Sequence, residues 1–399
     1  MKNLLFFILS VALLMTTGCN KAKVMTMTTK ADSVKIFFAG SGIITIDWGD
    51  GNSIITNTLL AYDENKNNGF GEGQVYKHRY SGASEHIITI TGENITHLDC
   101  RDNQLTNLDL GKNNLTHLTC SFNQLTNLDL GKSSDLAYLW CSNNQLTNLA
   151  VNKNTALTEL ACWKNQLECL DVNKNTKLIE LSCSNNQLVN LDVSKNTTLT
   201  KLLCSTNQLS NLDVSKNAEL TYLECGANQL ISLDVGKNIA LKSLGCSGNQ
   251  LLSLDVSKNT TLTMLHCNGN QLTSLNLSNS LGYLSCSNNQ LISLDVSKNT
   301  AMTALYCNKN QLTSLDVSKN AVLASLYCND NQLISLDVSK NFALTYLNCT
   351  TNQLDADRLD ALFKTLHDNS EVKIIDISSN PGTDDCDQSI ATNKGWKVW

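Results

Sequence analysis

From residue 94 onward the apolar and polar positions follow one pattern, L-x-x-L-x-C-x-x-N-Q-L-x-x-L-D-V-S-K-N. In L-x-C the two apolar side chains alternate with a variable residue, which predicts a short β-strand with one inward face. The cysteines recur every 21 residues, apart from one step of 20 and one of 19, at Cys100, Cys120, Cys141, Cys162, Cys183, Cys204, Cys225, Cys246, Cys267, Cys286, Cys307, Cys328 and Cys349. Stacking of such repeats predicts a parallel sheet with strands about 4.8 Å apart.

The repeat resembles the leucine-rich repeat, with cysteine in the third leucine position. The resemblance implies an α/β-type solenoid that is mostly β and right-handed, with a curved parallel sheet. It also implies that the concave face of this sheet binds a partner. Bacterial surface proteins such as the internalins are similar, and so are surface lipoproteins of Bacteroidetes-type bacteria. We expect about 13 repeats over residues 94–354, then a final repeat and a helical C-terminal cap over residues 355–399.

Residues 30–93 have a different pattern, in which strand-forming runs are separated by glycine turns. The glycines at 49 and 51 predict a tight hairpin turn. The sequence Trp-Gly-Asp-Gly at 48–51, with His78 and Tyr80 later, resembles the PKD-type β-sandwich. The chain runs into the first repeat without a linker, so we expect this segment to form the N-terminal cap of the solenoid.

The first residues have the features of a secretory signal: a basic Lys2, an apolar core, and small residues before Cys19. The ending Thr-Thr-Gly-Cys resembles a bacterial lipoprotein box, in which the cysteine carries the lipid; Thr16 departs from the usual leucine. We expect a signal peptide over residues 1–18, a lipidated Cys19, and a tether over residues 19–29. This predicts secretion across the inner membrane and anchoring at the bacterial outer membrane or cell surface.

The recurring cysteines allow three interpretations: disulfides, metal ligands or core packing. Parallel neighbours in register point side by side, which disfavours disulfides, and a 21-residue step lacks the close pairs of a zinc site. A free cysteine is small and readily buried, so the pattern predicts core packing. Cys169 and Cys386 lie outside the pattern and are interpreted as lone thiols.

Two polar positions recur with the cysteines. The asparagine three residues after each cysteine is expected to bond backbone groups where the chain leaves the strand. Each aspartate of the L-D-V segment has a lysine three residues later, and Asn276 and Asn279 replace both in the short repeat. We therefore expect each aspartate and lysine to act as a unit in the convex turn.

Aromatic side chains gather at the variable positions that flank the inward leucine. Because these positions point out of the concave sheet, the aromatics are the predicted ligand-binding residues. They form two groups and one separate residue: Phe122, Tyr138, Trp140 and Trp163; His266, Tyr283, Tyr306, Tyr327 and Tyr346; and Tyr222. We expect Tyr306 and Tyr327, which occupy the same position in adjacent repeats, to stack.

Charge and motifs exclude several functional classes. The net charge of −6 provides no basic surface for nucleic acid. No phosphate loop, zinc pattern or nucleophile with a base at consistent spacing is present, so we expect neither enzymatic activity nor a cofactor. His97, Asp99, Arg101 and His117 share one patch, but variable concave positions sample such residues freely.

The sequence thus predicts non-catalytic binding of a protein partner, in adhesion or another surface interaction. Two alternatives stay open: a glycan-binding module, because aromatic rings also stack on sugars, and a structural spacer.

Overall fold

The computed structural model describes residues 23–399 except 53, 63–73, 83, 132 and 370–371. The predicted signal peptide and Cys19 lie outside the described residues. The chain forms two compact units, Met1–Asn175 and Thr176–Trp399. The boundary falls within the repeats, so both units contain turns of the solenoid.

The first unit begins with antiparallel strands. Their bounds are β1 (Lys23–Thr29), β2 (Ser33–Asp47), β3 (Ile55–Thr58), β4 (Gln74–Arg79), β5 (His86–Asp99) and β6 (Leu105–Asp109). Strand β1 pairs with β5 and β6, and β2 pairs with β3, β4 and β5. Alternate residues such as Met25, Met27, Ile36 and Ile46 are fully buried, as period-2 alternation requires. The PKD-type sandwich stays a prediction.

Strand β2 differs from the sequence prediction. The glycine pattern predicts two strands separated at positions 40 and 42, but one strand continues through both. Gly40 lies so close to β5 that an added Cβ would be 2.1 Å from the Asn94 carbonyl oxygen. The register against β5 shifts here, so these glycines form a bulge rather than a turn. The turn at Gly49 and Gly51 is confirmed, and both have a positive φ.

The residues of the two N-terminal motifs contact one another. The rings of Trp48 and His78 stack with centroids 4.8 Å apart, and His78 Nε2 lies 2.8 Å from Asp50 Oδ2. The Tyr80 hydroxyl donates to the Trp48 carbonyl at 2.9 Å. Hydrogen bonds from the backbone N–H and then the side chain of Asn52 lower the pKa of Asp50 to about 2, and His78 adds to the shift.

The repeats of the first unit start inside β5, whose last residues form the first parallel strand. His97 of β5 is in register with His117 of β7 (His117–Thr119), then with Tyr138 of β8 (Tyr138–Trp140) and Glu159 of β9 (Glu159–Ala161). Strand β5 therefore belongs to both the antiparallel sheet and the solenoid. The antiparallel sheet and the solenoid are therefore joined without a linker.

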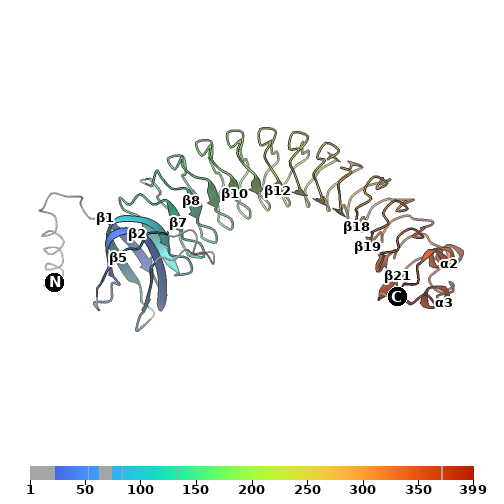
Figure 1. Ribbon diagram of the computed structural model, residues 1–399, viewed down its shortest axis with the longest axis horizontal. Coiled ribbons are helices and arrows are strands. Elements are labelled where there is room, and N and C mark those ends of the chain that lie inside the picture. Colours follow the sequence, from blue (N-terminus) through green and yellow to red (C-terminus); the bar gives the residue numbers. More distant parts are fainter. Residues whose placement is uncertain (1–22, 53, 63–73, 83, 132, 370–371) are drawn as a thin grey trace, which may run out of the picture. The chain divides into compact units, whose positions relative to one another are not determined.

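The second unit continues with strands of three residues in parallel register, several of which are labelled in Figure 1. They are β10 (Glu180–Ser182), β11 (Lys201–Leu203), β12 (Tyr222–Glu224), β13 (Ser243–Gly245), β15 (Met264–His266), β17 (Tyr283–Ser285), β18 (Ala304–Tyr306), β19 (Ser325–Tyr327) and β20 (Tyr346–Asn348). On the opposite wall, β14 (Ser253–Asp255) pairs with β16 (Ser274–Asn276). The predicted parallel-sheet solenoid is confirmed.

The thirteen recurring cysteines, called the cysteine ladder below, are buried and their thiols are reduced. Each lies beside inward leucines, such as Leu181 and Leu188 around Cys183, which are also fully buried. Burial raises the pKa of the Cys183 thiol to about 12, which keeps it protonated and unreactive. The core-packing interpretation is confirmed. Of the two other cysteines, Cys169 is exposed and Cys386 is partly exposed.

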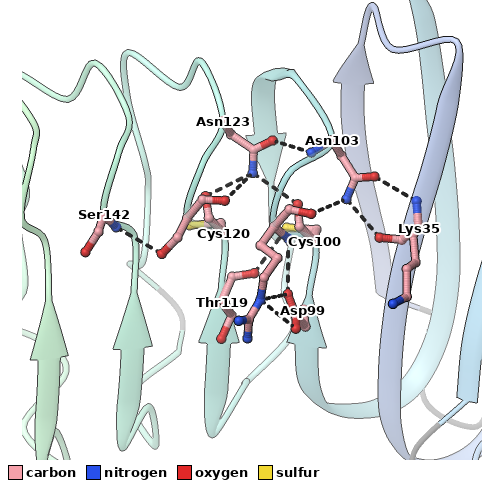
Figure 2. A network of polar contacts seen from close by, with 10 residues as sticks. Lys35, Asp99, Cys100, Asn103, Thr119, Cys120, Asn123 and Ser142 are labelled. Atoms are coloured by element: carbon pink, nitrogen blue, oxygen red, sulfur yellow. Dashed lines mark hydrogen bonds and ion pairs between the residues drawn. The ribbon is translucent and has the colours of Figure 1, made fainter. Parts of the chain in front are cut away.

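The asparagine after each ladder cysteine bonds backbone groups of two turns, as expected. In Figure 2, Asn123 Nδ2 donates to the Cys100 and Cys120 carbonyls, at 3.0 and 2.9 Å, and its Oδ1 accepts from the Asn103 N–H at 3.1 Å. Asn103 in turn donates to the Lys35 carbonyl of β2 and accepts from the Lys35 N–H. The asparagine network thus joins the solenoid to the N-terminal sheet.

A second row of buried asparagines follows the L-D-V-S-K segment, and sequence analysis assigned it no role. Asn217 Nδ2 donates to the Val193 carbonyl at 3.0 Å and to the Asn196 carbonyl at 2.8 Å. Asn238 repeats both bonds one turn later, to Val214 and Asn217. Each turn is therefore tied to the preceding one on two sides of the core.

The aspartates of the L-D-V segment act on the backbone. The Oδ1 atom of Asp213 accepts from the Ser215 N–H at 2.8 Å, and Asp316 does the same with Ser318. These bonds come first or second among the causes that lower the pKa of both carboxyls, and the lysines contribute less. Each of these two aspartates therefore fixes its turn through a peptide N–H, and the aspartate–lysine unit stays a prediction.

The helix α2 (Ala356–Thr365) begins at Asp355, whose carboxylate accepts from the Arg358 N–H at 2.9 Å. Its buried residues are Leu359, Leu362 and Phe363, which recur at helical spacing, and the helix lies in the predicted C-terminal cap. Lys394 caps the other end, because its Nζ donates to the carbonyls of Lys364 and Leu366 at 2.6 and 2.7 Å.

The final repeat follows this helix. Strand β21 (Lys373–Asp376) pairs with β20, and β22 (Trp396–Val398) pairs with β21, after the short helix α3 (Ser389–Thr392). Ile377 is fully buried in the cysteine position, and Asn380 donates to the Cys349 and Ile377 carbonyls. Trp396 is buried, at 2% exposure, with its Nε1 donating to the His367 carbonyl.

Candidate binding surface of the parallel sheet

The candidate surface is formed by the two residues that flank the central leucine of each strand. In β19, Leu326 is fully buried, whereas Ser325 and Tyr327 lie on the outward face. Because the strands are parallel and in register, equivalent side chains of successive repeats form rows. The outward face of each unit is therefore a grid whose chemistry depends on these variable positions.

In the second unit the predicted aromatic residues form one continuous row, called the aromatic row below. The ring centroids are 4.9 Å apart from His266 to Tyr283, 5.5 Å to Tyr306, 4.7 Å to Tyr327 and 4.7 Å to Tyr346. Tyr306 and Tyr327 are nearly parallel, at 19°, so the predicted stack is confirmed. Five adjacent strands, β15 to β20, carry one aromatic ring each.

The aromatic row is half-buried, and this affects its hydroxyl groups. Burial raises the pKa of Tyr283 and Tyr327, with smaller contributions from the neighbouring tyrosines. These hydroxyls therefore stay protonated near neutral pH and can donate hydrogen bonds. The tyrosine rings at Tyr306, Tyr327 and Tyr346 cover one another's faces, so the row presents mainly ring edges and hydroxyl groups.

Tyr222 lies apart from the aromatic row. It belongs to β12, and its neighbours in register are Lys201 and Ser243, neither of which is aromatic. Its side chain is 38% exposed and lies beside Glu224 of the same strand. Tyr222 borders an open recess of about 730 Å³ over β10, β11 and β12.

In the first unit the predicted aromatic group is divided. Phe122 and Trp163 meet edge to face with centroids 6.1 Å apart. Trp140 has polar partners instead: its Nε1 donates to Glu159 Oε1 at 2.7 Å, and the Arg101 guanidinium lies 5.8 Å from its ring centroid. Phe122 is 52% exposed and has a φ of 57°, an uncommon backbone conformation for a bulky residue.

Tyr138 belongs to a different cluster, the histidine stack, formed by Tyr62, His97, His117 and Tyr138. Successive ring centroids are 4.1, 4.1 and 4.3 Å apart, and the rings are within 16° of parallel. The position shared by His97, His117 and Tyr138 was visible as a repeat in the sequence. Tyr62 comes from the segment after β3, where no periodicity could indicate it.

The polar groups around the histidine stack bind one another. Arg101 Nε lies 3.0 Å from both carboxylate oxygens of Asp99. His97 Nδ1 lies 2.8 Å from Thr96 Oγ1. Burial lowers the pKa of His97 to about 4, and the neighbouring His117 adds to the shift. Within the described residues, no three His, Cys, Asp or Glu side chains are grouped as metal ligands would be.

The solenoid and its cysteine ladder are similar to those of known bacterial proteins. The functional domain of InlJ from Listeria monocytogenes, which includes a cysteine ladder, is 34% identical, with a TM-score of 0.58 over 72% of this chain and 76% of that one. A leucine-rich repeat protein of Leptospira interrogans is 25% identical (TM-score 0.61; 72% and 78% covered). YopM from Yersinia enterocolitica is 26% identical (TM-score 0.56; 65% and 56%).

No protein-family model and no curated relative matches the chain. In the part of the chain that the structure describes, every helix is too short or too polar to cross a bilayer.

Proposed function

Because the chain belongs to the leucine-rich repeat proteins, we propose that it is a non-catalytic binding protein displayed at a bacterial surface. The outward face of its parallel sheet would bind a protein partner, in adhesion or another surface interaction. The aromatic row of the second unit would be the centre of this contact, and Phe122, Trp140 and Trp163 of the first unit would contribute further anchors.

The observation that carries this proposal is the continuity of the aromatic row. Five aromatic rings on adjacent strands form one half-buried surface. Tyrosine supplies a large, rigid contact area together with a hydroxyl group, and for this reason it is common at binding hot spots. Packing of the rings on their neighbours also holds them in place before binding, which reduces the entropy lost on association.

Ring orientation favours a protein over a glycan. Aromatic residues that bind sugars stack an open ring face against the sugar ring. The faces of Tyr327 lie against Tyr306 and Tyr346, so this ring presents its edge to a ligand. A protein surface can use ring edges and hydroxyls. Binding to a glycan array, or to nothing, would instead support the glycan-binding module or the structural spacer.

Membrane attachment would come from a lipid on Cys19, as the sequence ending Thr-Thr-Gly-Cys suggests. A Cys19→Ser variant expressed in the native host should either be cut and leave the detergent phase as soluble protein, or remain as uncut precursor. Detergent-phase partitioning of the processed chain is the measurement. A variant that is cut normally and still partitions with detergent contradicts lipidation at this position.

The binding surface is tested by removing two adjacent rings. After a partner is captured from surface proteins, Tyr306→Ala combined with Tyr327→Ala should weaken binding by about 2 kcal/mol or more, measured by calorimetry. The matched control is Val322→Ala with Phe342→Ala, two exposed apolar residues of the same unit outside its strands. Loss of affinity in the control but not in the tyrosine variant would contradict the proposal.

A further inference from the structure

Charged residues are scarce on the outward face of the second unit. Among the residues that flank the central leucine of the parallel strands from β10 to β20, acidic and basic side chains occur only at Glu180, Lys201 and Glu224. Lys201 Nζ pairs with Glu180 Oε2 at 3.1 Å. Within the described residues, no side-chain cation lies within 4.0 Å of the Glu224 carboxylate. Glu224 is therefore the one uncompensated charge in these rows.

The position of this carboxylate depends on a glycine in the next strand. Gly245 of β13 is in register with Glu224. A Cβ atom added at Gly245 would lie 1.9 Å from Glu224 Oε2 and 2.7 Å from Oε1, so the carboxylate occupies the space that any other residue would fill. The other residue that flanks the central leucine of β13 is the small Ser243, and both Ser243 and Gly245 are buried.

Glu224 and Tyr222 also form one wall of the open recess described above. Lys201 and Leu203 of β11 and Glu180 of β10 also line it. The recess, called the Glu224 recess below, has a volume of about 730 Å³. It therefore combines an aromatic ring and an apolar residue with Glu224, whose carboxylate has no side-chain cation within 4.0 Å among the described residues.

These features match the side chain of arginine or lysine. Its methylene groups can lie against Leu203 and the ring of Tyr222, while its charged end reaches the carboxylate. We propose that the Glu224 recess holds a basic side chain of the protein partner, and that the partner continues along the aromatic row, which begins at the strand after Gly245. This proposal rests on the protein-binding function proposed above and adds the charge that the partner must present.

The experiment selects ligands without knowing the natural one. A displayed library of random 12-residue peptides is enriched on the full chain and, separately, on its Glu224→Lys variant. The wild-type chain should enrich peptides that contain arginine or lysine at one fixed position. The Glu224→Lys variant should enrich peptides with aspartate or glutamate there. Circular dichroism of each variant confirms that the solenoid is folded.

The most enriched wild-type peptide is then measured against point variants by fluorescence anisotropy. Glu224→Gln should weaken binding at least tenfold. Gly245→Ala keeps every charge but displaces the carboxylate, and it should weaken binding to a similar extent. The matched controls are Glu219→Gln, an exposed glutamate in the turn before β12, and Gly282→Ala, where the added Cβ meets only ordinary contacts. Both should stay within twofold of wild type.

Each failure identifies the statement that is wrong. If the enriched peptides contain no basic residue, or if wild type and Glu224→Gln bind equally well, the proposal that the Glu224 recess binds a basic side chain is wrong. If Tyr306→Ala with Tyr327→Ala then still abolishes binding, the proposed function of the aromatic row stands. If only the Glu224 and Gly245 variants lose affinity, the recess stands and the role of the aromatic row is wrong. Enrichment of no peptide at all overturns both.

Discussion

The histidine stack of the first unit and the aromatic row of the second both use outward positions beside the central leucine of the strands, but they are built differently. In the histidine stack, successive centroids are 4.1 to 4.3 Å apart, and Tyr62 from outside the repeats covers its first ring. In the aromatic row, the spacing is 4.7 to 5.5 Å, and every ring comes from a repeat strand. The first cluster is closed by its own chain, whereas nothing comparable covers the aromatic row among the described residues.

This difference separates two uses of the outward face. A closed, desolvated stack stabilises the start of the sheet, since each ring buries apolar surface against the next. An open row retains the contact area that a partner needs. The interiors of the two units are alike, however, because both contain the same cysteine and asparagine positions. The comparison therefore predicts that equivalent substitutions in the two interiors reduce the unfolding free energy equally, whereas substitutions on the outward faces have different effects in the two units.

The largest expected effect tests whether the interiors are equivalent. Asn144 donates to the Cys120 and Cys141 carbonyls and accepts from the Leu125 N–H, all at 3.0 to 3.1 Å. In the second unit, Asn228 makes the three equivalent bonds: it donates to the Cys204 and Cys225 carbonyls and accepts from the Leu209 N–H. Replacement of either by alanine leaves buried backbone groups without this partner, so each variant should lose about 3 kcal/mol of unfolding free energy in urea.

The control for this prediction is Asn190→Ala, which removes an exposed asparagine and should cost less than about 0.5 kcal/mol. Costs for Asn144→Ala and Asn228→Ala that differ by more than about 1 kcal/mol would break the comparison, because the two interiors would then not be equivalent.

The sequence could predict whatever repeats with the solenoid. The burial of the cysteine ladder, the bonds of the asparagines and the stack of Tyr306 on Tyr327 all depend on one residue type at one register position. Periodicity alone places such residues in rows. The final repeat and helical cap expected over residues 355–399 contain the helix at 356–365 and the buried Ile377.

Features that depend on contacts across the repeat, or outside it, could not be predicted in this way. Tyr62 completes the histidine stack from a segment without periodicity. The continuity of β2 through Gly40 depends on the close approach of β5. The position of the Glu224 carboxylate depends on a glycine at the equivalent position of the next strand, Gly245. The 21-residue spacing places the two residues in register, but it does not show that the carboxylate lies over the glycine.

The smallest expected effect concerns the titration of the histidine stack. The Thr96 hydroxyl donates to the Ala39 carbonyl, so it accepts from His97 Nδ1–H, and a further proton must be added at Nε2. That atom is buried and has no hydrogen-bond partner among the described residues. The groups around it are the rings of Tyr62 and His117, with Asp99 and Arg101 paired to each other nearby. Protonation is therefore disfavoured in the folded chain.

Burial lowers the pKa of His97 from 6.5 to about 4, so the unfolded chain binds this proton more readily. The contribution to stability is complete above pH 6.5 and is lost as the pH falls toward 4. Because part of the imidazole is exposed to solvent, we expect a loss of about 1 kcal/mol between pH 7 and pH 5, measured by urea unfolding. His97→Phe keeps a ring in the stack and should remove this loss, whereas His266→Phe, at the end of the aromatic row, should not. If the unfolding free energies of wild type and His97→Phe depend equally on pH, burial in the closed stack does not affect the titration of His97, and this prediction is wrong.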